Sequence, residues 1–90
     1  MRFDLKKIKF RIREHPSITN VRLYQRFDYI NFNYHDGIVK RRLQLYLTPD
    51  KRVLALFDRD TNKLLGNELD SFFNYHHNYV RWIKLNVEKP

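Results

Sequence analysis

The sequence predicts an α+β fold, in which an antiparallel meander of four to five strands carries an N-terminal and a C-terminal helix on one face. Residues 18–65 alternate between apolar and polar side chains, interrupted by short segments rich in turn residues. The segments on either side repeat apolar residues at helical spacing. Ninety residues are typical of one domain, so we expect residues 1–90 to form a single domain.

The first predicted element is a helix over about residues 4–14. Asp4 is a suitable N-cap, and the helix should end before Pro16, which restricts the residue that precedes it. One stripe of this helix collects the aliphatic residues Leu5, Ile8 and Ile12. A strand is the alternative, because apolar and basic residues also alternate from Lys7 to Arg13. On the helix, Phe10 would face away from the aliphatic stripe.

The meander is predicted from four longer runs and one short run. The expected strands are Val21–Phe27, Tyr29–Tyr34, Val39–Leu47, Val53–Phe57 and a short Leu64–Leu65. Asp36-Gly37 is expected to form a two-residue hairpin turn between the second and third strands. Residues 48–51 and 58–63 have the composition of turns.

The C-terminal helix is expected to begin at Asn67, a favourable N-cap residue that is followed by two acidic residues in the first turn. Its apolar stripe is wide enough to cover one sheet face and comprises Leu69, Phe72, Phe73, His76, Tyr79, Val80 and Ile83. Tyr75 and Trp82 lie on one edge of the helix, outside this stripe. They either extend the core or form an exposed pair that binds a partner, since Tyr and Trp are frequent interface anchors.

Composition narrows the classes of function. The chain has no cysteine, which excludes a disulfide scaffold, a cysteine-ligated zinc site and thiol catalysis. Small secreted domains usually need such crosslinks, so we expect an intracellular, cytoplasmic protein. The uncharged stretches are much shorter than a membrane span, and the chain shows neither a Gly-rich phosphate loop nor metal-ligand spacing. We therefore expect no membrane partner, no metal and no cofactor.

The charge of the chain favours a polyanionic partner. Eighteen Lys and Arg against ten Asp and Glu give a net charge of +8. Residues 1–26 alone carry a net charge of +6, and Lys40-Arg41-Arg42 form a second basic cluster. A field of this sign attracts polyanions and accelerates their capture. Solubility without any partner is the alternative interpretation of this charge.

Strand alternation places a polar set on the sheet face that no helix is expected to cover. This set comprises Arg22, Tyr24, Arg26, Tyr29, Asn31, Asn33, Lys40, Arg42, Gln44 and Tyr46, none of which is a carboxylate. Arg and Lys neutralise phosphates, Tyr rings stack on unpaired bases, and Asn or Gln can bond base edges. A protein interface and a solvated face are the alternatives, because exposed antiparallel faces are polar and Tyr and Arg also favour protein contacts.

The leading hypothesis is a non-enzymatic nucleic-acid-binding module with a preference for single strands. Its predicted phosphate contacts on the sheet are Arg22, Arg26, Lys40, Arg41 and Arg42, although Arg41 is in the core phase of its strand. The residues predicted to stack on bases or contact their edges are Tyr24, Tyr29, Tyr46 and Asn31. The N-terminal helix offers a second basic surface, on which Lys6, Lys9 and Arg13 are predicted to contact phosphates. A solvated helix face is the alternative there.

Other hypotheses stay open. The chain has the size of a phage or mobile-element accessory or inhibitor protein that docks on a host protein, with Tyr75 and Trp82 as anchors. A metal-independent ribonuclease would use His35 or His77 with nearby Arg and Tyr. An exposed edge strand could pair with a second copy and form a homodimer. The run from Asp58 to Asn62 lacks the Gly and Glu of a calcium loop, so a turn is expected there.

Overall fold

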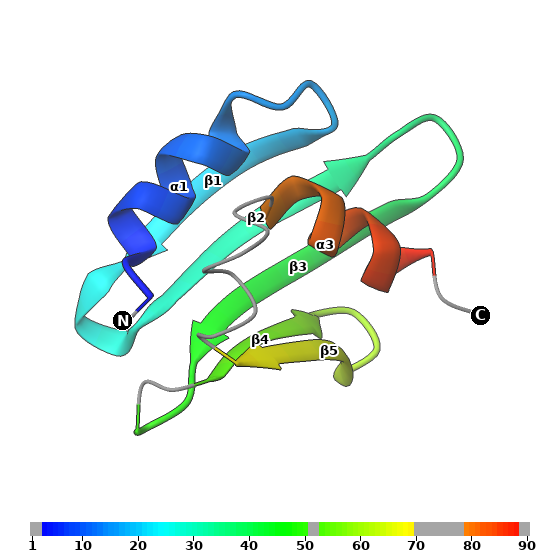
Figure 1. The fold of residues 1–90 in the computed structure, drawn as a ribbon. Coiled ribbons are helices and arrows are strands. Elements are labelled where there is room, and N and C mark those ends of the chain that lie inside the picture. Colours follow the sequence, from blue (N-terminus) through cyan, green and yellow to red (C-terminus); the bar gives the residue numbers. More distant parts are fainter. Residues whose placement is uncertain (1–2, 51–52, 70–78, 89–90) are drawn as a thin grey trace.

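The fold is α+β, and a computed structural model describes residues 3–50, 53–69 and 79–88 (Figure 1). Its elements in chain order are α1 (Leu5–Arg13), β1 (Ile18–Tyr24), the short 3-10 helix η1 (Gln25–Phe27), β2 (Tyr29–His35), β3 (Lys40–Leu47), β4 (Val53–Asp58), β5 (Lys63–Leu69) and α3 (Tyr79–Val87). The five strands pair antiparallel in sequence order, β1-β2-β3-β4-β5. The predicted meander is therefore confirmed, with a fifth strand of full length.

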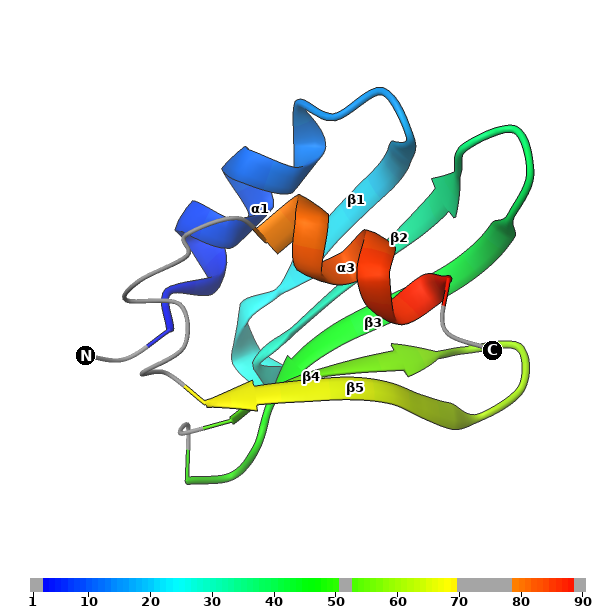
Figure 2. The ribbon, with the colours of Figure 1, turned by 45° about the vertical axis from the view of Figure 1, so that its right-hand side comes forward.

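Both helices pack on the same face of the sheet, as Figures 1 and 2 show. The core lies between these two layers and joins buried residues of α1, the strands and α3. Its fully buried members include Ile8 and Ile12 of α1, Leu43 and Leu45 of β3, and Ile83 of α3. Removal of this apolar surface from water is the main term that favours folding. The opposite sheet face, called the open face from here on, is covered by neither α1 nor α3.

The N-terminal segment is the predicted helix and not the alternative strand. The Asp4 carboxylate accepts hydrogen bonds from the backbone N–H groups of Lys6 (3.0 Å) and Lys7 (3.4 Å), which satisfies donors that the first turn leaves free. The aliphatic stripe of α1 is buried. Phe10 lies on the outer side of the helix, with 54% of its surface exposed.

The first strand ends earlier than predicted, and Phe27 is not a core residue. β1 stops at Tyr24, and Gln25–Phe27 form a single 3-10 turn that Asp28 closes in the left-handed region, with φ +57°. This turn interrupts the alternation, so that Phe27 is 64% exposed. Strict alternation from Val21 would place Gln25 in the core phase of the predicted strand, and Gln25 is exposed as well.

The β2–β3 connection is a hairpin, but its loop has four residues (36–39) where a two-residue turn was predicted. The Asp36 carboxylate accepts hydrogen bonds from the backbone N–H groups of Ile38 (3.0 Å) and Val39 (2.8 Å), so its side chain closes the loop. Gly37 adopts φ +93°, a conformation that glycine reaches without strain. These bonds lower the pKa of the Asp36 carboxyl, with the bond from Val39 contributing most.

The predicted helix start at Asn67 is wrong. Asn67 belongs to β5, where it pairs with Ala55 of β4, and the strand continues to Leu69. Pairing along the free edge of β4 prevails over the local capping signal, because it satisfies the backbone of the whole strand. The helical prediction holds over Tyr79–Val87. Phe72, Phe73 and His76 lie outside the described residues.

A glycine in β5 lets α3 approach the sheet. A Cβ atom on Gly66 would overlap the side-chain oxygen of Asn86 and would lie 2.5 Å from its Cγ. Asn86 is buried, and its amide donates a 2.8 Å hydrogen bond to the Trp82 carbonyl oxygen, which fixes the side chain against the helix. We expect Gly66→Ala to reduce the free energy of unfolding by about 1–3 kcal/mol, measured by urea denaturation, because it overpacks this contact.

Asn86→Ala provides the matched background for this test. With the Asn86 side chain removed, the added methyl group has space, and the cost of Gly66→Ala should largely disappear. An equal cost in both backgrounds would contradict the proposed contact.

The Tyr34 side chain, which is 1% exposed, makes the alkaline stability of the protein sensitive to pH. Burial, together with a 3.2 Å hydrogen bond to Asp36 and the charge of that carboxylate, raises the pKa of the Tyr34 phenol to about 12. Above about pH 10 the unfolded chain loses this proton while the folded chain keeps it. The free energy of unfolding should therefore fall between about pH 10 and 12, by on the order of 2–3 kcal/mol.

Chemical denaturation across this range should show the fall in the wild type. The variant Tyr34→Phe lacks this titrating group and should show a shallower fall. Identical slopes would contradict the assignment to Tyr34.

Candidate functional site

Strand pairing arranges the open face in rows that run across the sheet. Pairing of Tyr24 with Tyr29, and of Tyr29 with Tyr46, makes one row of three tyrosines. The second row contains Arg22, Asn31, Gln44 and Phe57. The third contains Thr19, Asn33 and Arg42, and the pair His35 and Lys40 lies beyond it. Successive rows are two residues apart along a strand, about 6.6 Å, so the face has an aromatic end and a basic end.

The aromatic end is a cluster of rings. The Tyr24 and Tyr29 rings stack with centroids 4.7 Å apart, and Phe27 stacks on Tyr29 at 6.3 Å. Tyr46 meets Phe57 edge to face at 6.4 Å. Phe27, at 64% exposed, and Tyr24, at 36%, are the most accessible of these rings, whereas Tyr29 and Tyr46 are half-buried. The sequence prediction did not place Phe27 on this surface. The one sign that the strand ends before Phe27 was the polar residue Gln25 at a position in the core phase.

Positive charge reaches the aromatic end through two arginines. Arg22 is exposed in the second row, one row from the tyrosines. The Arg26 guanidinium carbon lies 5.7 Å from the centre of the Phe27 ring, which is within the range of a cation–π contact. Two of the predicted phosphate-binding side chains therefore border the exposed rings.

The middle of the open face carries amide groups. The Gln44 Nε2 donates a 3.1 Å hydrogen bond to the Asn31 Oδ1 across the β2–β3 pair. Both side chains are half-buried. The Gln44 carbonyl oxygen and the Asn31 amide nitrogen stay available for a second bond, which is the donor and acceptor pair that base edges require.

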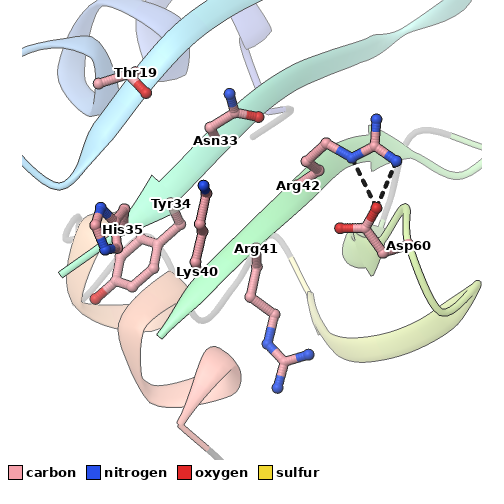
Figure 3. A pocket seen from close by; sticks show the side chains of 8 residues that line it. All are labelled: Thr19, Asn33, Tyr34, His35, Lys40, Arg41, Arg42 and Asp60. Carbon is pink, nitrogen blue, oxygen red and sulfur yellow. Dashed lines mark hydrogen bonds and ion pairs between the residues drawn. The ribbon is translucent and has the colours of Figure 1, made fainter. Parts of the chain in front are cut away.

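An open hollow of about 390 Å³ marks the basic end, and Figure 3 shows its lining. The lining residues are Thr19, Asn33, Tyr34, His35, Lys40, Arg41, Arg42 and Asp60. His35 and Lys40 are exposed neighbours across the last β2–β3 pair. Lys40, at the rim of this hollow, can contact a phosphate group.

Arg42 does not carry a free charge. Its Nε and Nη2 donate to Asp60 Oδ1 at 2.7 and 2.5 Å, drawn as dashed lines in Figure 3. This bond lowers the pKa of the Asp60 carboxyl and raises the pKa of Arg42. As predicted, the residues of β1 to β4 that lie on the open face include no carboxylate. The β4–β5 turn, however, brings the Asp60 carboxylate next to Arg42. The pairing joins residues 18 apart and depends on strand register, so sequence reasoning missed it.

Arg41 lies on the helix side of the sheet, as its core phase in β3 predicts, and therefore apart from the predicted phosphate contacts of the open face. Figure 3 shows the two side chains leaving β3 in different directions. The Arg41 Nη1 donates a 3.0 Å bond to Asp58, which is 1% exposed. The other Asp58 oxygen accepts the backbone N–H groups of Asp60 (2.9 Å) and Thr61 (3.3 Å). Arg41 therefore compensates a buried carboxylate that shapes the turn.

The predicted residues of α1 form a surface of their own on the helix layer. Lys6 and Arg13 are exposed, Lys9 is half-buried, and the Arg13 guanidinium carbon lies 5.1 Å from the centre of the Phe10 ring. Because α1 covers the opposite side of the sheet from the open face, one short ligand cannot contact both groups. The structure thus divides the predicted set into two surfaces.

No protein-family model, curated protein or solved structure matches this chain. Among residues 3–50, 53–69 and 79–88, no helix is long and apolar enough to cross a membrane. The same residues contain no group of three or more His, Asp or Glu side chains arranged to hold a metal ion.

Of the two roles that the sequence allowed for Trp82, core residue or exposed partner contact, the structure shows the first. Its side chain is 5% exposed and packs in the cluster between α3 and the sheet, so it offers no surface to a partner in this structure. Tyr75 and His77 lie outside the described residues. Of the two predicted histidines, the described part of the chain contains His35, which borders the hollow of the open face.

Proposed function

We propose that this protein binds single-stranded nucleic acid on the open face, with bases on the aromatic end and the phosphate backbone directed toward the basic end. One observation carries the proposal: strand register gathers Tyr24, Tyr29 and Tyr46 in one row and places amides and cations in the rows beside it. Unpaired bases expose flat faces that stack on aromatic rings, whereas paired bases in a duplex do not. This arrangement therefore favours a single strand.

The exposed rings are the best candidates for base stacking. Tyr29 is half-buried and has near-parallel ring neighbours in Tyr24 and Phe27, so its role is to hold them in place. Tyr24 and Phe27 retain the most accessible surface. A base on either ring gains contact area and excludes water at little further cost in side-chain entropy, because the rings are already packed.

The cations of the open face are placed for backbone contacts. Arg22 and Arg26 lie beside the rings, and Lys40 lies at the far end of the face. Four residues of β2 separate the tyrosine row from the third row, which corresponds to about 13 Å along the strand. A strand that crosses the face would therefore meet rings, amides and cations in turn. The open hollow at His35 and Lys40 would receive a terminal or bridging phosphate.

Removal of an exposed ring should weaken the binding of single strands. We expect Tyr24→Ala and Phe27→Ala each to reduce affinity for a single-stranded oligonucleotide by about 5- to 150-fold, which corresponds to the 1–3 kcal/mol of one base stack. Fluorescence anisotropy on labelled single- and double-stranded DNA and RNA measures this effect. Leu85→Ala, which truncates a 56% exposed apolar side chain on α3, is the control and should leave affinity unchanged.

The ratio of single-strand to duplex affinity decides the role of the rings. A ratio that stays constant in both variants would remove base stacking from the proposal. Absence of any binding at physiological salt would remove the proposal itself and would favour the docking of a protein on this face. Cleavage of the labelled RNA during the titration would instead favour the ribonuclease hypothesis, with His35 as the first residue to replace.

A change at the Arg42–Asp60 pair tests the proposal independently, because it should strengthen binding where removal of a ring weakens it. Asp60→Ala removes a negative charge from the basic end and frees the Arg42 guanidinium. We expect tighter binding and a salt slope that is steeper by about 0.7, the increment for one further phosphate contact on a single strand. Glu88→Ala makes the same change in net charge on the helix side and should alter the slope less. Equal effects of both variants would assign the change to net charge alone.

A further inference from the structure

The surface of α1 differs in chemistry from the open face. Five of its nine residues are basic and none is acidic: Lys6, Lys7, Lys9, Arg11 and Arg13. The buried aliphatic stripe faces the sheet. At 100° per residue, Phe10 lies almost opposite this stripe, with Lys6 on one side of it and Lys7 on the other. The outer side of α1 therefore presents cations around one exposed ring.

This surface lacks the amide and hydroxyl side chains that the open face carries. The segment Leu5–Arg13 contains neither Asn, Gln, Ser nor Thr, whereas the open face carries amides beside tyrosines. Its Phe10 ring is in contact with the Arg13 guanidinium. Lys and Arg side chains bind phosphates, and contacts to phosphates do not depend on the base sequence.

The two surfaces lie on opposite sides of a two-layer molecule. α1 packs on the face of the sheet that is opposite to the open face, as both ribbon views show (Figures 1 and 2). The smallest principal extent of the molecule is 25 Å. That is about three times the Debye length of about 8 Å at physiological ionic strength, so phosphates on one side repel those on the other only weakly.

We infer that one protein molecule binds two nucleic-acid segments at once, one on the open face and one along α1, and so bridges them. The inference rests on the proposed function for the open face and adds a second, phosphate-binding site formed by Lys6, Lys7 and Arg13. The segment on α1 is held by its phosphates, so both single and double strands fit it.

Energy transfer between two short, non-complementary single-stranded oligonucleotides, one with a donor dye and one with an acceptor, tests the bridge. Each is too short to pass from one face to the other. We expect transfer to appear when the protein is added and sedimentation to give one protein with two oligonucleotides. Lys6→Gln/Lys7→Gln should abolish transfer while the first binding step keeps its affinity. Gln preserves the helix, which circular dichroism verifies.

A charge-matched control separates the α1 surface from general electrostatics. Lys63→Gln/Lys84→Gln removes the same charge from β5 and from the half of α3 that is distant from α1 (Figure 2). This variant should keep the transfer. Loss of transfer in both double variants would overturn the assignment to α1. The affinity of the second binding step should fall more steeply with log salt in the wild type than in the single variant Lys6→Gln. The difference in slope should be about 0.7, the value for one phosphate contact on a single strand.

The remaining outcomes are distinct. Binding of one oligonucleotide per chain without transfer overturns the bridge but leaves the proposed function intact. No binding of either oligonucleotide overturns both. Transfer in a complex of two proteins with two oligonucleotides assigns bridging to a protein dimer and overturns the inference. Binding to phosphatidylserine vesicles that depends on Lys6 and Lys7, and that oligonucleotides do not displace, assigns the surface to lipid instead.

Discussion

The alternation of side chains along β3 is the constraint on which both the core and the open face depend. β3 is the central strand and pairs on both sides, so its pleat cannot rotate without breaking two ladders. Leu43 and Leu45 point into the core, and burial of these side chains holds the register. The same register then places Gln44 and Tyr46 on the open face. A shift by one residue would exchange the two sets, so the apolar contacts that stabilise the fold also determine which polar side chains of β3 lie on the candidate site.

The β4–β5 turn connects the two sides of the sheet. Two consecutive arginines of β3 point to opposite faces; Arg41 bonds Asp58, the last residue of β4, and Arg42 bonds Asp60 in the turn that follows. Asp58 is buried and also accepts backbone N–H groups of the turn, so it fixes the position from which Asp60 reaches Arg42. A carboxylate on the core side therefore helps to set the charge on the open side. The exposed Arg42–Asp60 pair contributes little to stability, and its main effect is to hold the Arg42 side chain in place.

Local chemistry predicted the elements whose signals agree with their tertiary setting. The Asp4 cap and the alternation from Lys40 to Leu47 are of this type, because side chain and backbone favour the same structure. The prediction failed where a local signal competed with strand pairing, as at Asn67, or where alternation was extended through a tight turn, as at Phe27. Arg41 and Asp60 depend on contacts between residues far apart in sequence. No periodicity within one strand contains that information.

The edge of the sheet at β1 contains one extra residue between Thr19 and Arg22, with Asn20 in the left-handed region at φ +54°. Such a bulge twists the outer backbone away from the flat geometry that a further strand would need. A chain of net charge +8 is kept apart from its copies by repulsion as long as it is free. The irregular β1 edge opposes growth of the sheet from one molecule into the next wherever copies are brought together, because it offers a further strand no regular row of backbone partners.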